Sequence, residues 1–171
     1  MGASPKLDRI DINILARLQA DSHMTNVQLA NAVGLSPSPC LQRVKRLEKA
    51  GYIQSYKAQI NVSRLLEHVI VFTEVTLADH RLNDFTKFER EIRREDNLEE
   101  CHLISGGYDY LLKFTVRSIA HYQEIITSIL DRNVGVDKYF SYIVIKTLFD
   151  KGAVPIEALL PQSAFSDAVR K

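Results

Sequence analysis

Hydrophobic residues in the first third of the chain recur at intervals of three and four positions, a pattern that predicts amphipathic helices. The first stripe, within residues 7–21, consists of Leu7, Ile10, Ile14, Leu15 and Leu18. A second helix is predicted over residues 25–33, because Thr25 and Gln28 have the spacing of a capping box and Gly34 follows the last turn.

The segment SPSPCLQRVKRLEKAGYI, residues 36–53, predicts a third helix with sharp ends. Ser36 is a suitable N-cap, Pro37 fits the first helical position, and Pro39 still lies within the first turn. Gly51 is expected to end this helix. Its inward face consists of Cys40, Val44 and Leu47.

The rest of the chain alternates between strand-like and helix-like stretches. Strands are predicted over residues 69–77, 101–104, 108–116 and 139–149, and helices over residues 82–92 and 118–130. The order βαββαβ is that of ferredoxin-like folds, in which Gly106-Gly107 would form the central hairpin turn.

These elements predict an α+β chain with two domains. Residues 1–60 hold a long helix, a short helix, a tight turn and a third helix, which is a helix-turn-helix, and residues 52–60 alternate like a strand that would make it winged. A hinge is expected at about 58–68, followed by a ferredoxin-like domain over residues 69–150. The tail, residues 151–171, receives no role.

The outer strands of the second domain are hydrophobic on both sides. In the first strand, Val71 and Val75 lie opposite Ile70 and Phe72; in the last, Phe140, Tyr142 and Val144 lie opposite Tyr139, Ile143 and Ile145. Two helices cover only one face of a four-stranded sheet, so the other face needs a partner. A second copy of the chain is the simplest partner, and we therefore expect a homodimer.

Composition narrows the class of protein. Hydrophobic residues make up 46% of the chain and charged residues 25%, which is typical of soluble globular proteins. No hydrophobic stretch reaches the roughly 18 residues of a membrane helix. The first residues lack a hydrophobic signal core, and Cys40 and Cys101 lie far apart in the sequence. We therefore expect a cytoplasmic protein with reduced thiols and no membrane partner.

The net charge of +1 conceals an asymmetry. Residues 1–60 hold eight Lys/Arg and four Asp/Glu, a balance of +4, while the remaining residues hold 14 basic and 17 acidic side chains, a balance of −3. A basic first third suggests a partner that carries phosphates. A chance distribution would explain the same count.

The third predicted helix has side chains suited to such a partner. Away from its hydrophobic side lie Ser38, Gln42, Lys45, Arg46 and Lys49. Ser and Gln can hydrogen-bond base edges, Lys and Arg can neutralise phosphates, and Ser36 could present backbone N–H groups to a phosphate. A solvated helix face would contain the same residues, but the three-helix arrangement and the regional charge favour double-stranded DNA.

Signatures of enzymes and metal sites are missing from the sequence. There is no Walker phosphate loop, no G-x-S-x-G elbow and no G-x-G-x-x-G opening a helix, and the five histidines lack metal-ligand spacing. We expect neither catalysis, nor a metal, nor a cofactor.

The stretch ISGGYDYLL, residues 104–112, allows two interpretations. In the first, the glycines form a turn, the tyrosines pack, and Asp109 hydrogen-bonds the loop backbone. In the second, exposed glycine N–H groups bind the carboxylate of a small ligand and Asp109 binds its ammonium group.

The first helix-turn-helix block, LDRIDINILARLQADSHMTNVQLANAVGLSPSPCLQRVKRLEKAGYI, closely resembles the reading head of the Lrp/AsnC family of bacterial transcription regulators. The later SGGYDYLLKF resembles the G-x-x-D-Y-x-L signature of the same family, and GVDKYFSYIVIK its last strand. The resemblance covers roughly residues 7–148. It implies a helix-turn-helix joined to a ferredoxin-like effector domain, dimers that often assemble into octamers, and an amino acid bound between dimers.

The resemblance also assigns residues. It implies that Ser36, Ser38, Pro39, Gln42, Arg43 and Arg46 lie at or near DNA, which together with Lys45 and Lys49 completes the candidate DNA-binding set. It places Gly106, Tyr108 and Asp109 in the effector loop, with Ser141 beside it, and Ile104 and Gly107 complete this candidate set. Two departures stand out: Asp21-Ser22-His23 replaces the usual D-G-R, and Gly107 replaces a charged residue.

The sequence therefore predicts a sequence-specific transcription regulator controlled by a small effector, an amino acid, and working as a homodimer that could assemble further into tetramers or octamers. An architectural DNA-binding protein without an effector is the alternative, and it differs only at residues 104–110. A stand-alone amino-acid sensor would leave the basic third helix without a purpose.

Overall fold

The computed structural model of the chain describes residues 6–152 and 154–159. Most of the tail expected over residues 151–171 lies outside this range. Ile60–Phe149 form one compact unit, called here the sheet unit, and the described residues on either side of it form a second, the helical unit. In the described range, no helix has both the length and the hydrophobicity needed to cross a membrane.

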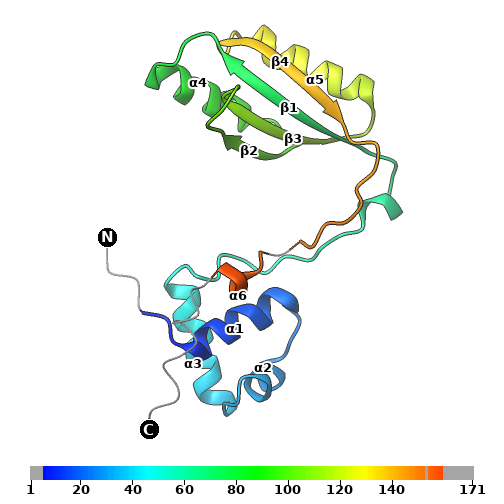
Figure 1. Cartoon of the computed structure of the whole chain (residues 1–171). Helices are drawn as coiled ribbons and strands as arrows, with labels where there is room; N and C mark the ends of the chain where they lie inside the picture. The colour runs from blue at the N-terminus through cyan, green and yellow to red at the C-terminus, as the bar shows by residue number, and fades with distance from the viewer. Residues whose placement is uncertain (1–5, 153, 160–171) are drawn as a thin grey trace. The chain divides into compact units, whose positions relative to one another are not determined.

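The helical unit contains the three predicted helices, α1 (Arg9–Ala20), α2 (Asn26–Ala32) and α3 (Pro37–Lys49) (Figure 1). Capping boxes start α1 and α2: Asp8 pairs with Asp11 in the first, and Thr25 with Gln28 in the second, as predicted. Ser36 is the N-cap of α3, but its hydroxyl makes no capping hydrogen bond.

Two glycines end α2 and α3, and one hydrophobic cluster holds the three helices together. Gly34 and Gly51 have φ of +70° and +77°, left-handed values that favour glycine and end α2 and α3. The cluster is formed by the buried Ile14, Leu29, Ala30, Cys40 and Leu47, with Val44 partly buried against it. The predicted inward face of α3 is therefore confirmed.

The strand predicted over residues 52–60 is wrong, because residues 53–61 carry neither helix nor strand. A lone extended segment has no ladder partner, so alternation alone does not make it a strand. The C-terminal segment returns to this unit: α6 (Ile156–Leu159) packs against α1. At Gly152, an added Cβ would lie only 3.2 Å from Nε2 of Gln59.

The sheet unit has the predicted βαββαβ order. After a short 3-10 turn, η1 (Val62–Arg64), its elements are β1 (Val69–Leu77), α4 (Leu82–Ile92), β2 (Leu98–Leu103), β3 (Tyr110–Val116), α5 (Ile119–Asp131) and β4 (Val136–Ile143). The sheet is antiparallel with strand order β2-β3-β1-β4. The hairpin turn between β2 and β3 spans residues 104–109, longer than the two glycines predicted for it.

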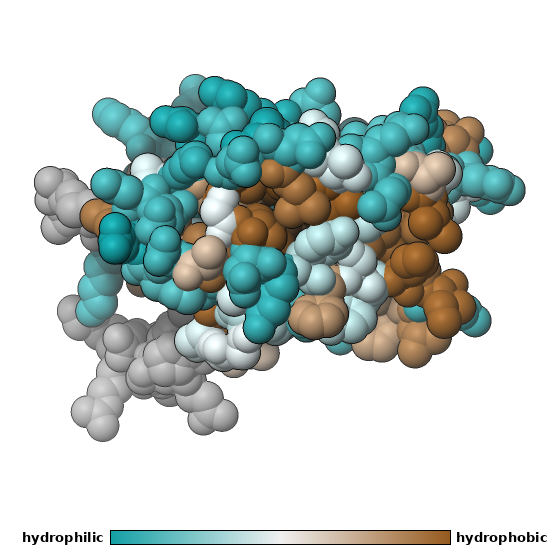
Figure 2. Space-filling model, turned by 90° about the horizontal axis from the view of Figure 1, so that it is seen from above, coloured by the Kyte–Doolittle hydropathy of each residue, from teal (hydrophilic) through white to brown (hydrophobic). Residues whose placement is uncertain are grey.

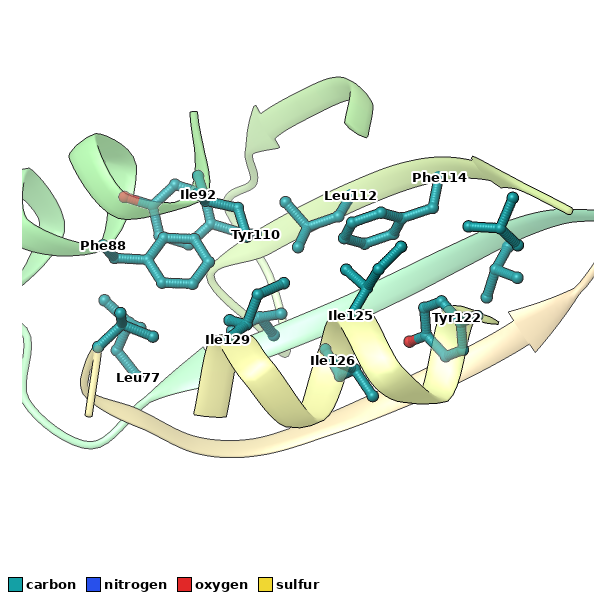
Figure 3. Close-up of a cluster of buried hydrophobic side chains, with 14 residues drawn as sticks. Leu77, Phe88, Ile92, Tyr110, Leu112, Phe114, Tyr122, Ile125, Ile126 and Ile129 are labelled. Carbon is teal, nitrogen blue, oxygen red and sulfur yellow. The ribbon is translucent and has the colours of Figure 1, made fainter. Parts of the chain in front are cut away.

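Helices α4 and α5 cover one face of this sheet. Alternate residues of β1 and β3, including Val71, Val75 and Leu112, are buried against them (Figure 3). The Phe88 and Tyr110 rings pack with centroids 4.6 Å apart. Because side chains alternate along a strand, the residues between them point to the opposite face. We call that opposite side the open face.

The open face is only partly hydrophobic. Its register places Ile70, Phe72, Glu74, Leu111, Lys113, Phe140 and Tyr142 there. One expectation needs correction: β1 is an inner strand between β3 and β4, not an outer one. Because β1 pairs with a strand on each edge, its side chains on both faces are flanked by side chains of two neighbouring strands. They are therefore more buried than the side chains of an edge strand would be.

Some large hydrophobic residues stay at the surface (Figure 2). On the open face, Phe140 and Tyr142 are 58% and 51% exposed. Others lie in the two segments that connect the units, namely Leu65, Leu66, Ile145, Leu148 and Phe149. Contiguous exposed patches of hydrophobic residues are typical of interaction sites, whereas scattered single residues are common on any protein surface.

Candidate functional site

One side of α3 carries an exposed polar stripe. Ser38, Gln42, Lys45 and Lys49 are all exposed and follow one another at intervals of four, three and four residues. This spacing aligns them on one helix face, while Cys40 and Leu47 point into the core from the opposite face. We call the four residues the reading surface. It offers two hydrogen-bonding side chains and two cations without any acid among them.

The first turn of α3 is less suited to binding a phosphate than the sequence suggested. Pro37 and Pro39 have no N–H, so Ser38 supplies the only free backbone donor of the first three helical positions. Asn26 Nδ2 donates to the Pro37 carbonyl over 2.8 Å, which fixes this turn to α2. Ser36 and Pro39 are exposed beside it.

Arg43 and Arg46 lie on a different side of α3 from the reading surface and bind acids of α1. Arg43 Nη1 donates to Asp8 Oδ2 over 2.7 Å and to Asp11 Oδ1 over 2.8 Å. Arg46 Nη2 donates to Asp11 Oδ2 over 2.5 Å. We call these four residues the ion cluster. The family resemblance implied that both arginines lie at or near DNA, and in the structure both are bonded to acidic residues at the start of α1.

Contacts within the ion cluster shift the pKa values of Asp8 and Arg43 toward their charged forms. Burial would raise the pKa of Asp8, but the Asp11 backbone N–H and the Arg43 guanidinium outweigh it and hold that pKa below its usual value. The hydrogen bonds to Asp8 and Asp11 in turn raise the pKa of Arg43. The Asp11 side chain is completely buried, although no sequence pattern considered above indicated it. Its signal is the spacing of two Asp and two Arg, each pair three residues apart.

The Gly-Gly loop has unused backbone donors. Among the described residues, neither Gly106 nor Gly107 donates its N–H to an acceptor in the chain. Their φ angles are not left-handed, and a Cβ would meet nothing within 4 Å at Gly107 and only Ile104 at 4.0 Å at Gly106. The turn itself therefore does not require glycine at either position.

Asp109 has partners inside the protein. Its Oδ2 accepts the Leu77 N–H over 2.7 Å, and His80 Nε2 lies 3.0 Å from Oδ1. The Ile104 N–H donates to the Asp109 carbonyl over 2.8 Å and closes the loop. The Asp109 side chain therefore bonds the backbone at the end of β1, and the contact within the loop is made by its main-chain carbonyl.

The two tyrosines of the loop differ. Tyr110 is buried and donates its hydroxyl hydrogen bond to Glu89 over 2.9 Å, and burial together with this contact raises its pKa. Tyr108 and Ile104 are only partly buried. Tyr110 is thus part of the core, while Tyr108 can meet a ligand or partner.

Ser141 does not join the loop within one chain. It pairs with Thr73 across β1 and β4, whereas the Asp109 N–H bonds Val75 on the other edge of β1. Its Oγ lies 2.6 Å from the Tyr122 hydroxyl, which lies 2.8 Å from the buried Thr73 Oγ1. Within one protomer this chain of hydroxyls holds α5 to the sheet.

No metal site is formed by the side chains that the structure describes, since no three His, Cys, Asp or Glu are grouped for one. Cys40 is buried in the helical core and Cys101 is exposed on β2, and neither is in a disulfide.

Comparisons with known proteins identify both units. A family model described as winged helix-turn-helix DNA-binding matches residues 7–54, and one described as Lrp/AsnC ligand binding domain matches residues 70–154. The transcriptional regulatory protein DoeX of Halomonas elongata is 42% identical over 143 residues, covering 84% of this chain and 90% of its own. The leucine-responsive regulatory protein of Escherichia coli is 43% identical over 140 residues, covering 82% and 85%.

A solved structure shows the same arrangement of elements. A transcriptional regulator from Neisseria meningitidis, crystallised as a complex with L-Met, matches with a TM-score of 0.82 at 30% sequence identity. The match covers 91% of this chain and 100% of that one.

Proposed function

We propose how the parts of this chain perform the function of the family to which it belongs. That family is the Lrp/AsnC family of DNA-binding transcription regulators, which are not enzymes. The reading surface of α3 contacts operator DNA, the loop over residues 104–109 binds an amino acid, and two copies associate through the open face. The observation that carries the proposal is the exposed stripe of α3, whose side chains have no hydrogen-bond or ion-pair partner among the residues that the structure describes.

The contact with DNA follows from the chemistry of the stripe. Ser38 and Gln42 can donate to and accept from base edges, and Lys45 and Lys49 lie one and two turns further along, where they can reach phosphates. The helix is held from behind by buried Cys40 and Leu47, so its exposed side can enter a major groove without rearrangement.

Neutralising the lysines should weaken DNA binding through its salt dependence. Lys45→Gln and Lys49→Gln should each reduce the slope of log K against log salt by about 1, whereas Gln42→Ala should reduce discrimination between sequences at an unchanged slope. Fluorescence anisotropy with a duplex that the protein enriches from a random pool measures both. Lys146→Gln, at an exposed lysine of the sheet unit, is the control. Equal slopes in all four proteins would contradict the assignment.

The proposal of an amino-acid ligand is supported by the unused donors of the loop. Two adjacent N–H groups without an acceptor among the described residues suit a carboxylate, and their glycines are not explained by the backbone conformation. A carboxylate has about four acceptor positions, so Asp109 retains capacity for an ammonium group beside Leu77 and His80. One relative is named for leucine and another was crystallised with L-Met, which makes these two the first ligands to test.

Replacing Gly107 by alanine should separate ligand binding from folding. Because the added methyl meets no atom within 4 Å, the melting temperature should stay within about 2 °C, or rise slightly. The methyl would occupy the space over the N–H groups and raise the Kd of the amino acid about tenfold, or about 1.4 kcal/mol. Calorimetry with the twenty amino acids measures this, with Ser105→Ala as the control in the same loop.

The same titration decides between the two functions predicted from the sequence. Heat from at least one amino acid supports a regulator with an effector. No heat from any of them, with DNA binding intact, would instead support an architectural DNA-binding protein.

Self-association is supported by the character of the open face. Its exposed aromatic residues Phe140 and Tyr142 lie among charges that are already paired within the chain, such as Lys113 with Glu100 over 3.1 Å. A face with hydrophobic residues and satisfied charges needs no partner of opposite charge, and a second copy related by a two-fold axis matches it.

An acid placed on this face should break the assembly. Phe140→Asp should shift the mass in solution, measured by light scattering, from a dimer or larger assembly toward the monomer of about 19.5 kDa. Leu82→Asp, at a residue 82% exposed on α4, should leave the mass unchanged. A wild-type monomer, or an F140D protein with the wild-type mass, would contradict association through this face.

A further inference from the structure

We infer that Asp11 is a positioning residue of the helix-turn-helix. It holds Arg43 and Arg46 away from DNA phosphates, so that base contacts by the reading surface dominate binding. The inference rests on the proposed function of that surface. Nothing in the family comparison assigns Asp11 a role, and it is the one fully buried acid among the residues that the structure describes.

Among the described residues, the Asp11 carboxylate accepts hydrogen bonds from three groups. Its Oδ1 accepts from Arg43 over 2.8 Å, and its Oδ2 accepts from Arg46 over 2.5 Å and from the Asp8 N–H over 3.1 Å. The carboxylate is fixed in the first turn of α1, which is itself closed by the capping box. Both guanidinium groups are therefore drawn to one defined point beside α1.

The position of the two arginines on α3 would also allow their side chains to reach DNA. They lie three residues apart, on the flank between the buried face and the reading surface. Their side chains remain 26% and 46% exposed, so they can reach solvent and phosphates when the ion pairs with the carboxylates are broken. Each long side chain has two alternative directions, toward α1 or toward a bound backbone.

The charge balance of the ion cluster explains how this arrangement affects the affinity for DNA. Two carboxylates and two guanidinium groups make the ion cluster neutral, which leaves Lys45 and Lys49 as the cations of the reading surface. Each further cation that meets a phosphate adds affinity for every DNA sequence alike. Withholding two arginines therefore lowers the affinity for all DNA by the same factor, so that base contacts make up a larger share of the binding energy and binding depends less on salt.

A purely structural role for Asp11 makes a different prediction. If the ion cluster only fastens α1 to α3, its loss lowers the stability of the helical unit and weakens binding to all duplexes in parallel. If it restrains the arginines, its loss strengthens binding to unrelated DNA. The sign of the change separates the two roles.

The test uses the full chain with two variants, Asp11→Asn and Asp8→Asn. The second is the milder, because the Asp8 side chain is 51% exposed and asparagine is an equally good N-cap. The probes are the duplex that the wild-type protein enriches from a random pool and a scrambled duplex of the same composition. Affinity is measured over a series of salt concentrations at a temperature at which circular dichroism shows each variant folded.

Both variants should bind the scrambled duplex about three- to tenfold more tightly at low salt, with a slope steeper by about 1 for each arginine released. The affinity for the enriched duplex should rise by the same factor, which leaves the affinity ratio between the two duplexes unchanged. Asp21→Asn, which removes the same charge at the other end of α1 without touching the arginines, should change neither the affinity nor the slope by as much. If Asp11→Asn does not fold, Asp8→Asn gives the result.

Unchanged slopes, or weaker binding to both duplexes, would overturn the inference and leave Asp11 with a structural role only. An equal effect of Asp21→Asn would overturn it too, because the change would then reflect net charge. If the wild-type protein prefers no duplex at all, the proposed function fails together with the inference.

Discussion

A carboxylate that solvent cannot reach needs cations from its own protein, and Asp11 imposes this requirement on the helical unit. In the part of the chain that the structure describes, Arg43 and Arg46 on the flank of α3 supply these cations, so they fix the rotation of α3 about its axis. The hydrophobic contacts of Cys40 and Leu47 fix its depth. Together these interactions determine which residues face outward, and the outward set is the stripe that begins at Ser38.

The exposed surfaces of the sheet unit likewise follow from which faces its own elements cover. Its helices α4 and α5 cover one face, and the hydroxyl chain from Thr73 through Tyr122 to Ser141 ties α5 to two strands. No element of the unit covers the other face, which explains why aromatic residues stay exposed there. The loop that carries Gly106 and Gly107 is held to β1 through Asp109, so its unused N–H groups keep a fixed position.

Much of this could be predicted from the sequence. Periodicity and capping residues located the helices and most of the strands, because these signals are local, and the resemblance to a known family added the function. Interactions between distant residues were missed for the same reason. The spacing of Arg43 and Arg46 indicates exposure on α3, and only the packing of α1 shows that Asp8 and Asp11 are opposite them.

Other errors have the same physical origin. The extended segment after Tyr52 looks like a strand but lacks a neighbour to pair with. The return of α6 to α1 depends on where the chain leads after β4, which no short pattern encodes.

The most direct test of this account is a crystal structure of the protein bound to a DNA duplex that it selects. The account predicts Gln42 within about 3 Å of a base edge in the major groove, with Arg43 still bonded to Asp8 and Asp11. A complex in which Arg43 binds a phosphate, or in which α3 lies outside the groove, would contradict it.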